Sequence, residues 1–318
     1  MKRNQVFEDI KQGNGRLIDA KKIRGYKYPQ KKLKFSDKDI ILYSLAIGFG
    51  QDPLNRRHFK YIYENDPNFQ AFCTLPVIGG VSSGQISEEK QIPGMQDFSP
   101  TQLLFGEQVI EIYQQVKPNV EYSFDRRVLD ISDKVKGLLL TKESKCTDDK
   151  GELVSISTQT IFIRGLGGFG DKGTIHLPCP KRPPTKPDKI VTEKIQANTA
   201  LIYRLTGDWN PIHIDLDLAN LGGFEKPILH GLCSFGIAAR IVYENYCMSQ
   251  DLNNSGIEEK ESLRKIGARF TTPIYPGETL IVKLWRKEQR IQFEAAIKER
   301  RNRIAVVGYA ELRQNAKL

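Results

Sequence analysis

Residues 203–241 read YRLTGDWNPIHIDLDLANLGGFEKPILHGLCSFGIAARI, and the rest of the chain can be arranged around this stretch. Its first motif, GDWNPIH at residues 207–213, brings a carboxylate, an amide and an imidazole close together in sequence. Asparagine favours the N-cap of a helix, and proline favours the first helical position. We therefore expect Asn210 to cap a helix that begins at Pro211.

The carboxylate of Asp208 and the imidazole of His213 are candidates for shared chemistry. On one regular helix these two residues would point about 140° away from each other, so they do not share a helix face. With Asp208 in the turn before the helix and His213 in its first turn, both side chains converge in front of the helix N-terminus. Such a pair acts as general acid and base on a water molecule. The alternative is a capping box beside a buried, fully hydrogen-bonded histidine.

The second motif, KPILHGL at residues 226–232, leads into another predicted helix. The apolar residues of this helix recur at intervals of three and four, at Leu232, Phe235, Ala239 and Val242. Gly231 lies at the helix start, where free N–H groups and the positive end of the helix dipole suit a developing oxyanion. His230 is expected to cap this turn, and we assign it no catalytic role.

Length and composition indicate a globular protein of two ordinary domains or one double domain. The chain has 318 residues, of which 39% are hydrophobic and 27% charged. No apolar run approaches the ~20 residues of a membrane span, and the charged N-terminus lacks the apolar region of a secretory signal. The five cysteines are scattered without a C-x-x-C spacing, which predicts free thiols, a reducing compartment and no metal site.

The formal net charge of +10 admits a nucleic acid, an anionic membrane surface or a small polyanion as partner. The basic residues are spread along the chain, with modest clusters at 21–24, 31–34 and 300–303 and no nucleic-acid-binding motif beside them. A solvated surface is the default for such clusters. We therefore expect no nucleic acid partner, whereas a small polyanion is compatible with this charge.

A segment rich in proline and lysine divides the chain into two halves. We expect a polar N-terminal segment at 1–26, a first domain at 27–170, a stiff linker at 171–189, a second domain at 190–313 and a tail at 314–318. In each half a helix precedes several strands, which is an α+β order. The expected helices are 37–48, capped by Ser36 or Asp37, and 194–205. The expected strands are 108–113, 120–128, 137–141, 153–163, 268–274, 278–285, 291–297 and 304–312.

The two halves share a weak internal duplication. Residues 117–122 (KPNVEY) have a rough counterpart in residues 275–281 (YPGETLI), each a proline turn followed by a strand. The first half contains no counterpart of the GDWNPIH motif, and its predicted helix has no histidine. We therefore expect one catalytic centre per chain.

The motif Gly-Asp-x-Asn-Pro-aliphatic-His, followed by Leu-His-Gly at 229–231, resembles the signature of the R-specific 2-enoyl-CoA hydratases, the hydratase 2 or MaoC-like family. The resemblance runs from about Tyr28 to Leu312 and is greatest to the hydratase unit of peroxisomal multifunctional enzymes of β-oxidation. It implies a double hot-dog fold, in which each half is a long helix wrapped by an antiparallel sheet. It also implies hydration of trans-2-enoyl-CoA to (3R)-3-hydroxyacyl-CoA without a metal or organic cofactor.

The resemblance assigns roles to individual residues. Asp208 and His213 become the acid and base that act on the water, Asn210 orients this water, and the Gly231 N–H polarises the thioester carbonyl. The first half loses its chemistry and houses the acyl chain. The residues expected to contact the acyl-CoA are Phe105, Gly106, Lys134, Trp209 and Phe270.

Three of these predicted contacts have alternative interpretations. Phe105 replaces the histidine that is usual in the family before this glycine, so only the backbone contact of Gly106 carries over directly. Phe270, on a predicted strand, is equally suited to core packing. Lys134 lies between Asp133 and Lys136 and is equally suited to a plain surface position.

The last three residues, Ala316, Lys317 and Leu318, resemble the Ser-Lys-Leu peroxisomal address that an import receptor reads. Together with the family resemblance, they predict a peroxisomal protein of fatty-acid β-oxidation, expected as a homodimer. The alternative functions are a hot-dog acyl-CoA thioesterase and a non-catalytic acyl-CoA binder.

Overall fold

The computed structural model describes residues 18–81, 88–248 and 261–314 of the chain. The proposed targeting residues Ala316, Lys317 and Leu318 and most of segment 1–26 lie outside these ranges. No helix within the described ranges is both long and apolar enough to cross a membrane. All five cysteines lie within these ranges, and none of them forms a disulfide there.

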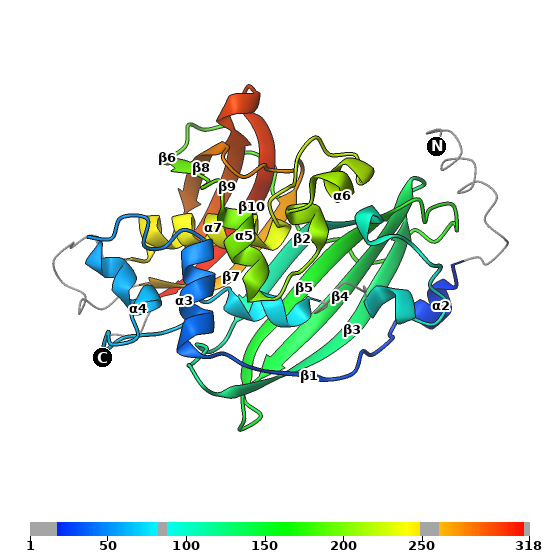
Figure 1. The fold of residues 1–318 in the computed structure, drawn as a ribbon, viewed down its shortest axis with the longest axis horizontal. Helices are drawn as coiled ribbons and strands as arrows, with labels where there is room; N and C mark the ends of the chain where they lie inside the picture. The colour runs from blue at the N-terminus through cyan, green and yellow to red at the C-terminus, as the bar shows by residue number, and fades with distance from the viewer. Residues whose placement is uncertain (1–17, 82–87, 249–260, 315–318) are drawn as a thin grey trace.

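In the described part of the chain, ten antiparallel strands form one continuous sheet that curves around helix α7, Gly231–Tyr246 (Figure 1). The strands of the first half are β1 (Lys31–Lys34), β2 (Leu103–Ile112), β3 (Glu121–Asp133), β4 (Gly137–Thr147) and β5 (Leu153–Arg164). Those of the second half are β6 (Lys189–Lys194), β7 (Glu261–Phe270), β8 (Thr279–Lys287), β9 (Arg290–Ile297) and β10 (Arg303–Gln314). The predicted α+β, double hot-dog architecture is confirmed.

The strand order shows that the two halves repeat each other. The sheet runs β1-β3-β4-β5-β2 through the first half and β7-β10-β9-β8-β6 through the second, so the second half mirrors the first about the β2–β7 pair. The counterparts inferred from sequence, residues 117–122 and 275–281, lead into β3 and β8, which occupy equivalent places. The pairing of Val109 with Gly267 lies in the middle of the junction that joins the halves.

The helix of the second half is α7 (Gly231–Tyr246), which is buried through most of its length and packs on β2, β7 and β10. In Figure 1 it lies in the middle of the molecule, within the curve of the sheet. Two shorter helices pack against each other nearby, α3 (Asp37–Ala46) and α5 (Thr199–Tyr203). Ser36 caps α3 through a capping box with Asp39, so the predicted start of this helix is confirmed.

The two halves differ in what covers the inner face of the sheet. The helix expected to be wrapped by the first half, α3, packs instead on α4 (Phe59–Ile62) and α5. A short 3-10 segment, Leu75–Gly80, lies over β3, β4 and β5 in its place. This segment has six residues, whereas α7 has sixteen, so it covers less of the sheet. Other side chains therefore fill part of the inner face of the first half.

The described end of segment 1–26 belongs to the first half, in contrast to the peripheral position expected. Helix α2 (Ala20–Ile23) places Ile23, fully buried, in an apolar cluster against Val128 and Leu140. The guanidinium of Arg24 donates to Asp130 at 2.8 Å and to Asp171 at 2.9 Å. Sequence inspection missed these contacts because a short charged segment shows no helical periodicity.

Both edge strands were also missed, for a physical reason. β1 reads KKLK and β6 reads KIVTEK, and each lies at an outer edge of the sheet. Charged, lysine-rich edges prevent pairing with other chains, but they hide the alternation that identifies a strand.

Candidate active site

The GDWNPIH motif forms a tight turn followed by a single 3-10 turn over Pro211–His213. Asn210 is the N-cap, as predicted, and its side chain accepts from the Ile212 N–H at 3.2 Å. The regular helix expected from Pro211 is therefore only one turn long. The next helix, α6 (Leu216–Leu221), has its own cap at Asp215. Gly207 supplies the bend before the motif with a φ of 129°, a conformation that favours glycine.

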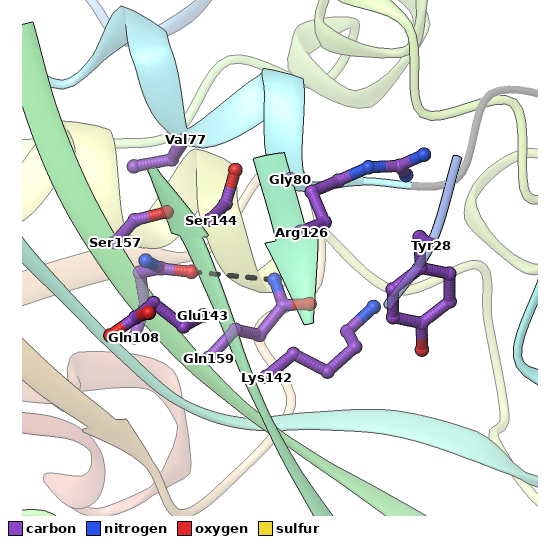
Figure 2. A pocket seen from close by; sticks show the side chains of 10 residues that line it. All are labelled: Tyr28, Val77, Gly80, Gln108, Arg126, Lys142, Glu143, Ser144, Ser157 and Gln159. Carbon is purple, nitrogen blue, oxygen red and sulfur yellow. Dashed lines mark hydrogen bonds between the residues drawn. The ribbon is translucent and has the colours of Figure 1, made fainter. Parts of the chain in front are cut away.

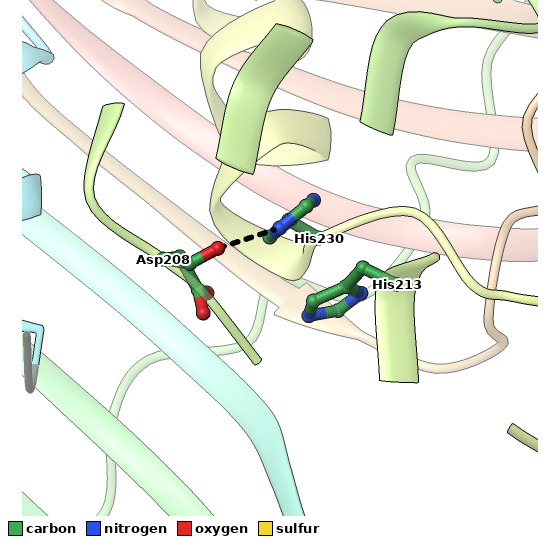
Figure 3. Close-up of side chains that lie close together, drawn as sticks. All are labelled: Asp208, His213 and His230. Atoms are coloured by element: carbon green, nitrogen blue, oxygen red, sulfur yellow. Dashed lines mark hydrogen bonds between the residues drawn. The ribbon is translucent and has the colours of Figure 1, made fainter. Parts of the chain in front are cut away.

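Three buried side chains from separate parts of the stretch meet at one point. Asp208, His213 and His230 each place one polar atom within 4.8 Å of the other two (Figure 3). Their exposed fractions are 8%, 5% and 0%. The convergence predicted for Asp208 and His213 is therefore present, with His230 added to it.

The hydrogen bond of His213 decides which ring nitrogen is free. Its Nδ1 lies 2.7 Å from the backbone oxygen of Ile228, and a carbonyl only accepts, so Nδ1 carries the proton and donates. Nε2 is left unprotonated. Burial lowers the pKa of His213, although the nearby Asp208 carboxylate partly opposes this shift. A neutral imidazole with a free Nε2 is equipped to accept a proton.

His230 holds His213 and the motif backbone together. Its ring stacks on that of His213, with centroids 3.6 Å apart and planes 26° apart. Its Nε2–H donates to the backbone oxygen of Asp208 at 3.2 Å. Burial, and then the neighbouring His213, hold its pKa well below the usual histidine value. The capping role expected for His230 is wrong, because its side chain makes no cap hydrogen bond to α7.

Two polar atoms of the cluster have no hydrogen-bond partner among the described residues, namely Oδ2 of Asp208 and Nδ1 of His230. The other carboxylate oxygen, Oδ1, accepts from the Asn210 N–H at 3.3 Å, which fixes the carboxylate in place. An unpaired buried polar atom is costly, so a group of this kind favours a small polar guest such as water.

Gly231 begins α7 directly after His230, and its N–H has no acceptor in the described part of the chain. Two predicted substrate contacts flank it. A Cβ added at Gly231 would lie 3.1 Å from the Cβ of Phe105 and 3.6 Å from the ring of Phe270. The structure thus brings the free N–H, two half-buried phenylalanines and the histidine pair together at the tip of α7.

The other predicted substrate contacts are Gly106, Trp209 and Lys134. Gly106 occupies a β-bulge between β2 and β5, which leaves an extra residue outside the strand pairing. Trp209 is 40% exposed and lies under the guanidinium of Arg204, 4.2 Å from its ring centroid. Lys134 is exposed in the turn between β3 and β4, and even the nearer strand, β4, is separated from β7 by β5 and β2, so the structure does not bring it to the cluster.

Asp208, His213 and His230 are also residue types that hold a divalent metal. A nitrogen lone pair lies in the plane of its ring, and zinc binds imidazole nitrogens at about 2.0–2.1 Å. Two nearly parallel rings stacked at 3.6 Å do not direct their lone pairs at one ion. The geometry therefore suits acid–base chemistry better than metal binding.

Comparisons with known proteins agree on one family. Residues 33–165 match the MFE-2 hydratase 2 N-terminal domain, and residues 179–307 match the MaoC like domain. Probable enoyl-CoA hydratase 2 of Dictyostelium discoideum is 34% identical over 274 residues, covering 85% of this chain and 87% of that protein. Other relatives are bacterial.

Two further similarities extend this finding. Peroxisomal multifunctional enzyme type 2 of Mus musculus is 33% identical over 91% of this chain, which spans only 38% of that enzyme. The crystal structure of a MaoC-like dehydratase from Phytophthora capsici superposes with a TM-score of 0.77 at 30% identity, over 93% of this chain and 99% of that one.

Proposed function

This chain belongs to the MaoC-like hydratase 2 family, and we propose that it adds water to a trans-2-enoyl-CoA to give the (3R)-3-hydroxyacyl-CoA. The observation that carries the proposal is the convergence of Asp208, His213 and His230, directly before Gly231 at the start of α7. An acid, a base and an oxyanion donor around one small polar molecule are the parts that hydration of a conjugated thioester needs.

In the proposed mechanism, His213 accepts a proton from the water through its free Nε2, Asp208 is the other member of the acid–base pair, and Asn210 orients this water. The water oxygen forms a bond to C3 of the substrate, and the electron pair of the double bond moves toward the thioester oxygen. The enolate then takes a proton at C2 from the same acid–base pair. One water is consumed, and no electron acceptor is required.

Gly231 supports the charged stage of this reaction. Its N–H lies at the positive end of a sixteen-residue helix, where a developing enolate oxygen is stabilised. Phe105 and Phe270 on either side would contact the thioester end of the substrate and exclude bulk water. Gly106, Trp209 and Lys134 remain proposed contacts for other parts of the acyl-CoA.

We further propose a peroxisomal, homodimeric protein that acts in fatty-acid β-oxidation. The support for the location is that several relatives are named as peroxisomal, including those from mouse and Arabidopsis thaliana. We also propose that residues 171–189 link the two domains. In support of this, residues 171–188 contain no helix or strand and separate β5 from β6.

One experiment separates hydration from the runner-up, thioester hydrolysis. With a trans-2-enoyl-CoA, a hydratase removes the enoyl-thioester absorbance without releasing thiol, and chiral analysis of the product should give the 3R isomer. Release of free CoA from a saturated acyl-CoA would favour a thioesterase instead. Binding of acyl-CoA without any turnover would favour a non-catalytic binder.

The pH profile tests the protonation state of His213. Because burial lowers its pKa, we expect the acid limb of kcat/KM to have its midpoint below the ordinary histidine value of about 6.5. Below that pH the folded protein also binds fewer protons than the unfolded chain. The free energy of unfolding therefore decreases as the pH is lowered. Incubation at each pH followed by assay at neutral pH separates unfolding from titration. A midpoint at or above the ordinary value would contradict this assignment.

Chelation tests the choice between acid–base and metal chemistry. We expect the rate of hydration to be unchanged after prolonged treatment with EDTA or a stronger zinc chelator and removal of the chelator. The reason is that the stacked rings of His213 and His230 do not direct their lone pairs at one ion. Loss of activity that returns on addition of a divalent cation would show that the cluster binds a metal.

A further inference from the structure

A band of polar side chains crosses the inner face of the first-half sheet. We call it the polar belt, and it consists of Gln108 on β2, Arg126 on β3, Lys142 and Ser144 on β4, and Ser157 and Gln159 on β5. All six are at most 7% exposed, yet they line a pocket (Figure 2). Six buried polar side chains on four adjacent strands are unusual, because polar groups are costly to bury, and in the second half α7 packs on the sheet.

The polar belt separates two apolar regions on the same face. On one side lie Phe124 and Cys146, which belong to the main core around α7. On the other side lie Leu140 and Ile161, which belong to a second apolar cluster. The short 3-10 segment Leu75–Gly80 covers this face, and the ideal Cβ of its last residue would lie 3.5 Å from Ser144. The belt therefore lies between two apolar regions and beneath this 3-10 segment, and its six side chains are buried.

The charges of the belt are already neutralised inside the protein. Arg126 donates to Glu88 at 2.5 Å, and Lys142 pairs with Glu89, which is 1% exposed. The ring of Tyr28 lies beside both cations, 5.3 Å from the Arg126 guanidinium and 5.6 Å from the Lys142 ammonium. A pocket of paired charges has no strong requirement for an ionic guest, so hydrogen-bonding groups decide what it accepts.

Two glutamines form a chain of amides whose direction is fixed. Gln108 donates its Nε2–H to the backbone oxygen of Val109 at 2.9 Å, so its Oε1 is the atom that accepts. Gln159 donates its own Nε2–H to this Oε1 at 3.3 Å, the dashed line in Figure 2. The chain ends at Oε1 of Gln159, an acceptor that has no donor among the described residues.

Three further atoms of the pocket have no partner in the described residues: Nε of Arg126, Oγ of Ser144 and the hydroxyl of Tyr28. Each of these can donate, whereas Oε1 of Gln159 can only accept. A carboxylate offers no donor to Gln159, and a methyl end satisfies none of the four atoms. A hydroxyl group can donate to Oε1 of Gln159 and accept from one or two of the three donors, so it suits both kinds of atom.

The belt lies only a short distance along the strands from the proposed reaction centre. Phe105, which flanks Gly231, pairs across β2 and β5 with Ile161, and Gln159 is two residues further along β5 on the same face. Two residues of a strand span about 7 Å. An acyl tail that leaves the tip of α7 along this face therefore passes Ile161 and meets the belt.

We propose that the polar belt binds a hydroxyl group on the acyl tail, so that this chain prefers hydroxylated trans-2-enoyl-CoAs to alkyl ones of equal length. The proposal rests on the proposed hydratase function. It alters the expectation that the first half simply houses an acyl chain, because methylene groups placed against the belt would leave its four unpaired atoms unsatisfied.

The test compares matched trans-2-enoyl-CoAs of increasing length that end in either a methyl or a hydroxymethyl group. We expect kcat/KM to favour the hydroxylated member by about tenfold, equivalent to about 1.4 kcal/mol, at the lengths that reach the belt. Ser144→Ala should bring this ratio close to one, and so should Gln159→Leu. Ser144→Ala removes an atom without a partner, so it leaves the fold intact even if the Gln159 variant does not fold.

Ser44→Ala is the matched control. Its hydroxyl is also buried without a partner, but it lies on α3 and outside the belt, so the preference should persist in this variant. Crotonyl-CoA, whose acyl group is too short to reach the belt, should be hydrated equally by all variants. An equal rate for both tails at every length, or a preference that survives in Ser144→Ala, would overturn the proposal.

A binding experiment separates this proposal from the function on which it rests. Calorimetry with saturated acyl-CoAs of the same two tail types requires no reaction. Absence of crotonyl-CoA hydration would refute the hydratase function. Tighter binding of the hydroxylated tail, lost in Ser144→Ala and kept in Ser44→Ala, would support the belt as a hydroxyl site, whereas equal binding would reject it.

Discussion

Asp208→Asn and His213→Gln are each expected to lower kcat/KM for a trans-2-enoyl-CoA by about 10³-fold or more, while the protein remains folded. The expectation combines loss of a general acid or base, worth about 10²–10⁴-fold, with loss of water positioning. Asparagine keeps the shape of Asp208 and can still accept from the Asn210 N–H, but it cannot take a proton. Glutamine removes the free imidazole nitrogen of His213.

Matched controls exist elsewhere in the chain. Asp149→Asn and His176→Gln make the same chemical changes at exposed positions outside the cluster and should leave the rate unchanged. Thermal unfolding and far-UV circular dichroism would establish that the two site variants keep the wild-type fold. If both site variants retained at least a tenth of the wild-type rate, the acid–base assignment would be wrong.

Gly231→Pro should lower kcat by about 10²–10³-fold, equivalent to about 2.7–4 kcal/mol of lost oxyanion stabilisation. Proline has no N–H, and the first position of a helix tolerates it, so α7 should still form. The enolate oxygen would then lose a donor at the positive end of the helix. Kinetics with crotonyl-CoA, which has little acyl tail to misplace, would measure this loss.

Gly231→Ala provides the control for the added bulk. It keeps the N–H but places a Cβ 3.1 Å from that of Phe105, so a smaller loss through crowding is expected. The ratio of the two variants isolates the contribution of the N–H. Equal rates in Gly231→Pro and Gly231→Ala would show that this N–H does not stabilise the transition state.

Much of the proposed site was accessible from local sequence rules. The cap at Asn210, the turn before it and the start of α7 at Gly231 all depend on residue types whose backbone preferences are strong. These preferences place Asp208, His213 and Gly231 at element ends, which is where free polar groups occur. The helix expected after Pro211 proved to be one 3-10 turn, because Asp215 caps a separate helix.

The position of His230 could not be predicted from local sequence rules. It lies seventeen residues after His213, and nothing in that spacing predicts that the two rings stack. The segment before α7 is held against the motif by the Ile228 N–H, which donates to the oxygen of Ile212 at 3.4 Å, and by the His230 Nε2–H, which donates to the oxygen of Asp208 at 3.2 Å. Contacts between segments distant in sequence depend on packing, which propensities do not encode.

The polar belt is a second feature that local sequence rules did not predict. In the sequence, Ser157, Gln159 and Lys142 read as ordinary solvent-facing polar residues of strands. Only their position across four adjacent strands, under a short 3-10 segment, shows that they are buried and face one pocket. The alternation of a strand gives two faces but not which of them the rest of the chain will cover.

The sequence by itself determined the α+β class, the duplicated plan and the residues at the tip of α7, because caps, turns and periodicity act over a few neighbouring positions. The tertiary structure alone decided that His230 stacks on His213, that residues 18–26 join the first-half core, and that the inner face of that half carries hydrogen-bonding groups. Those outcomes depend on which surfaces meet and exclude water, and that is a property of the whole folded chain.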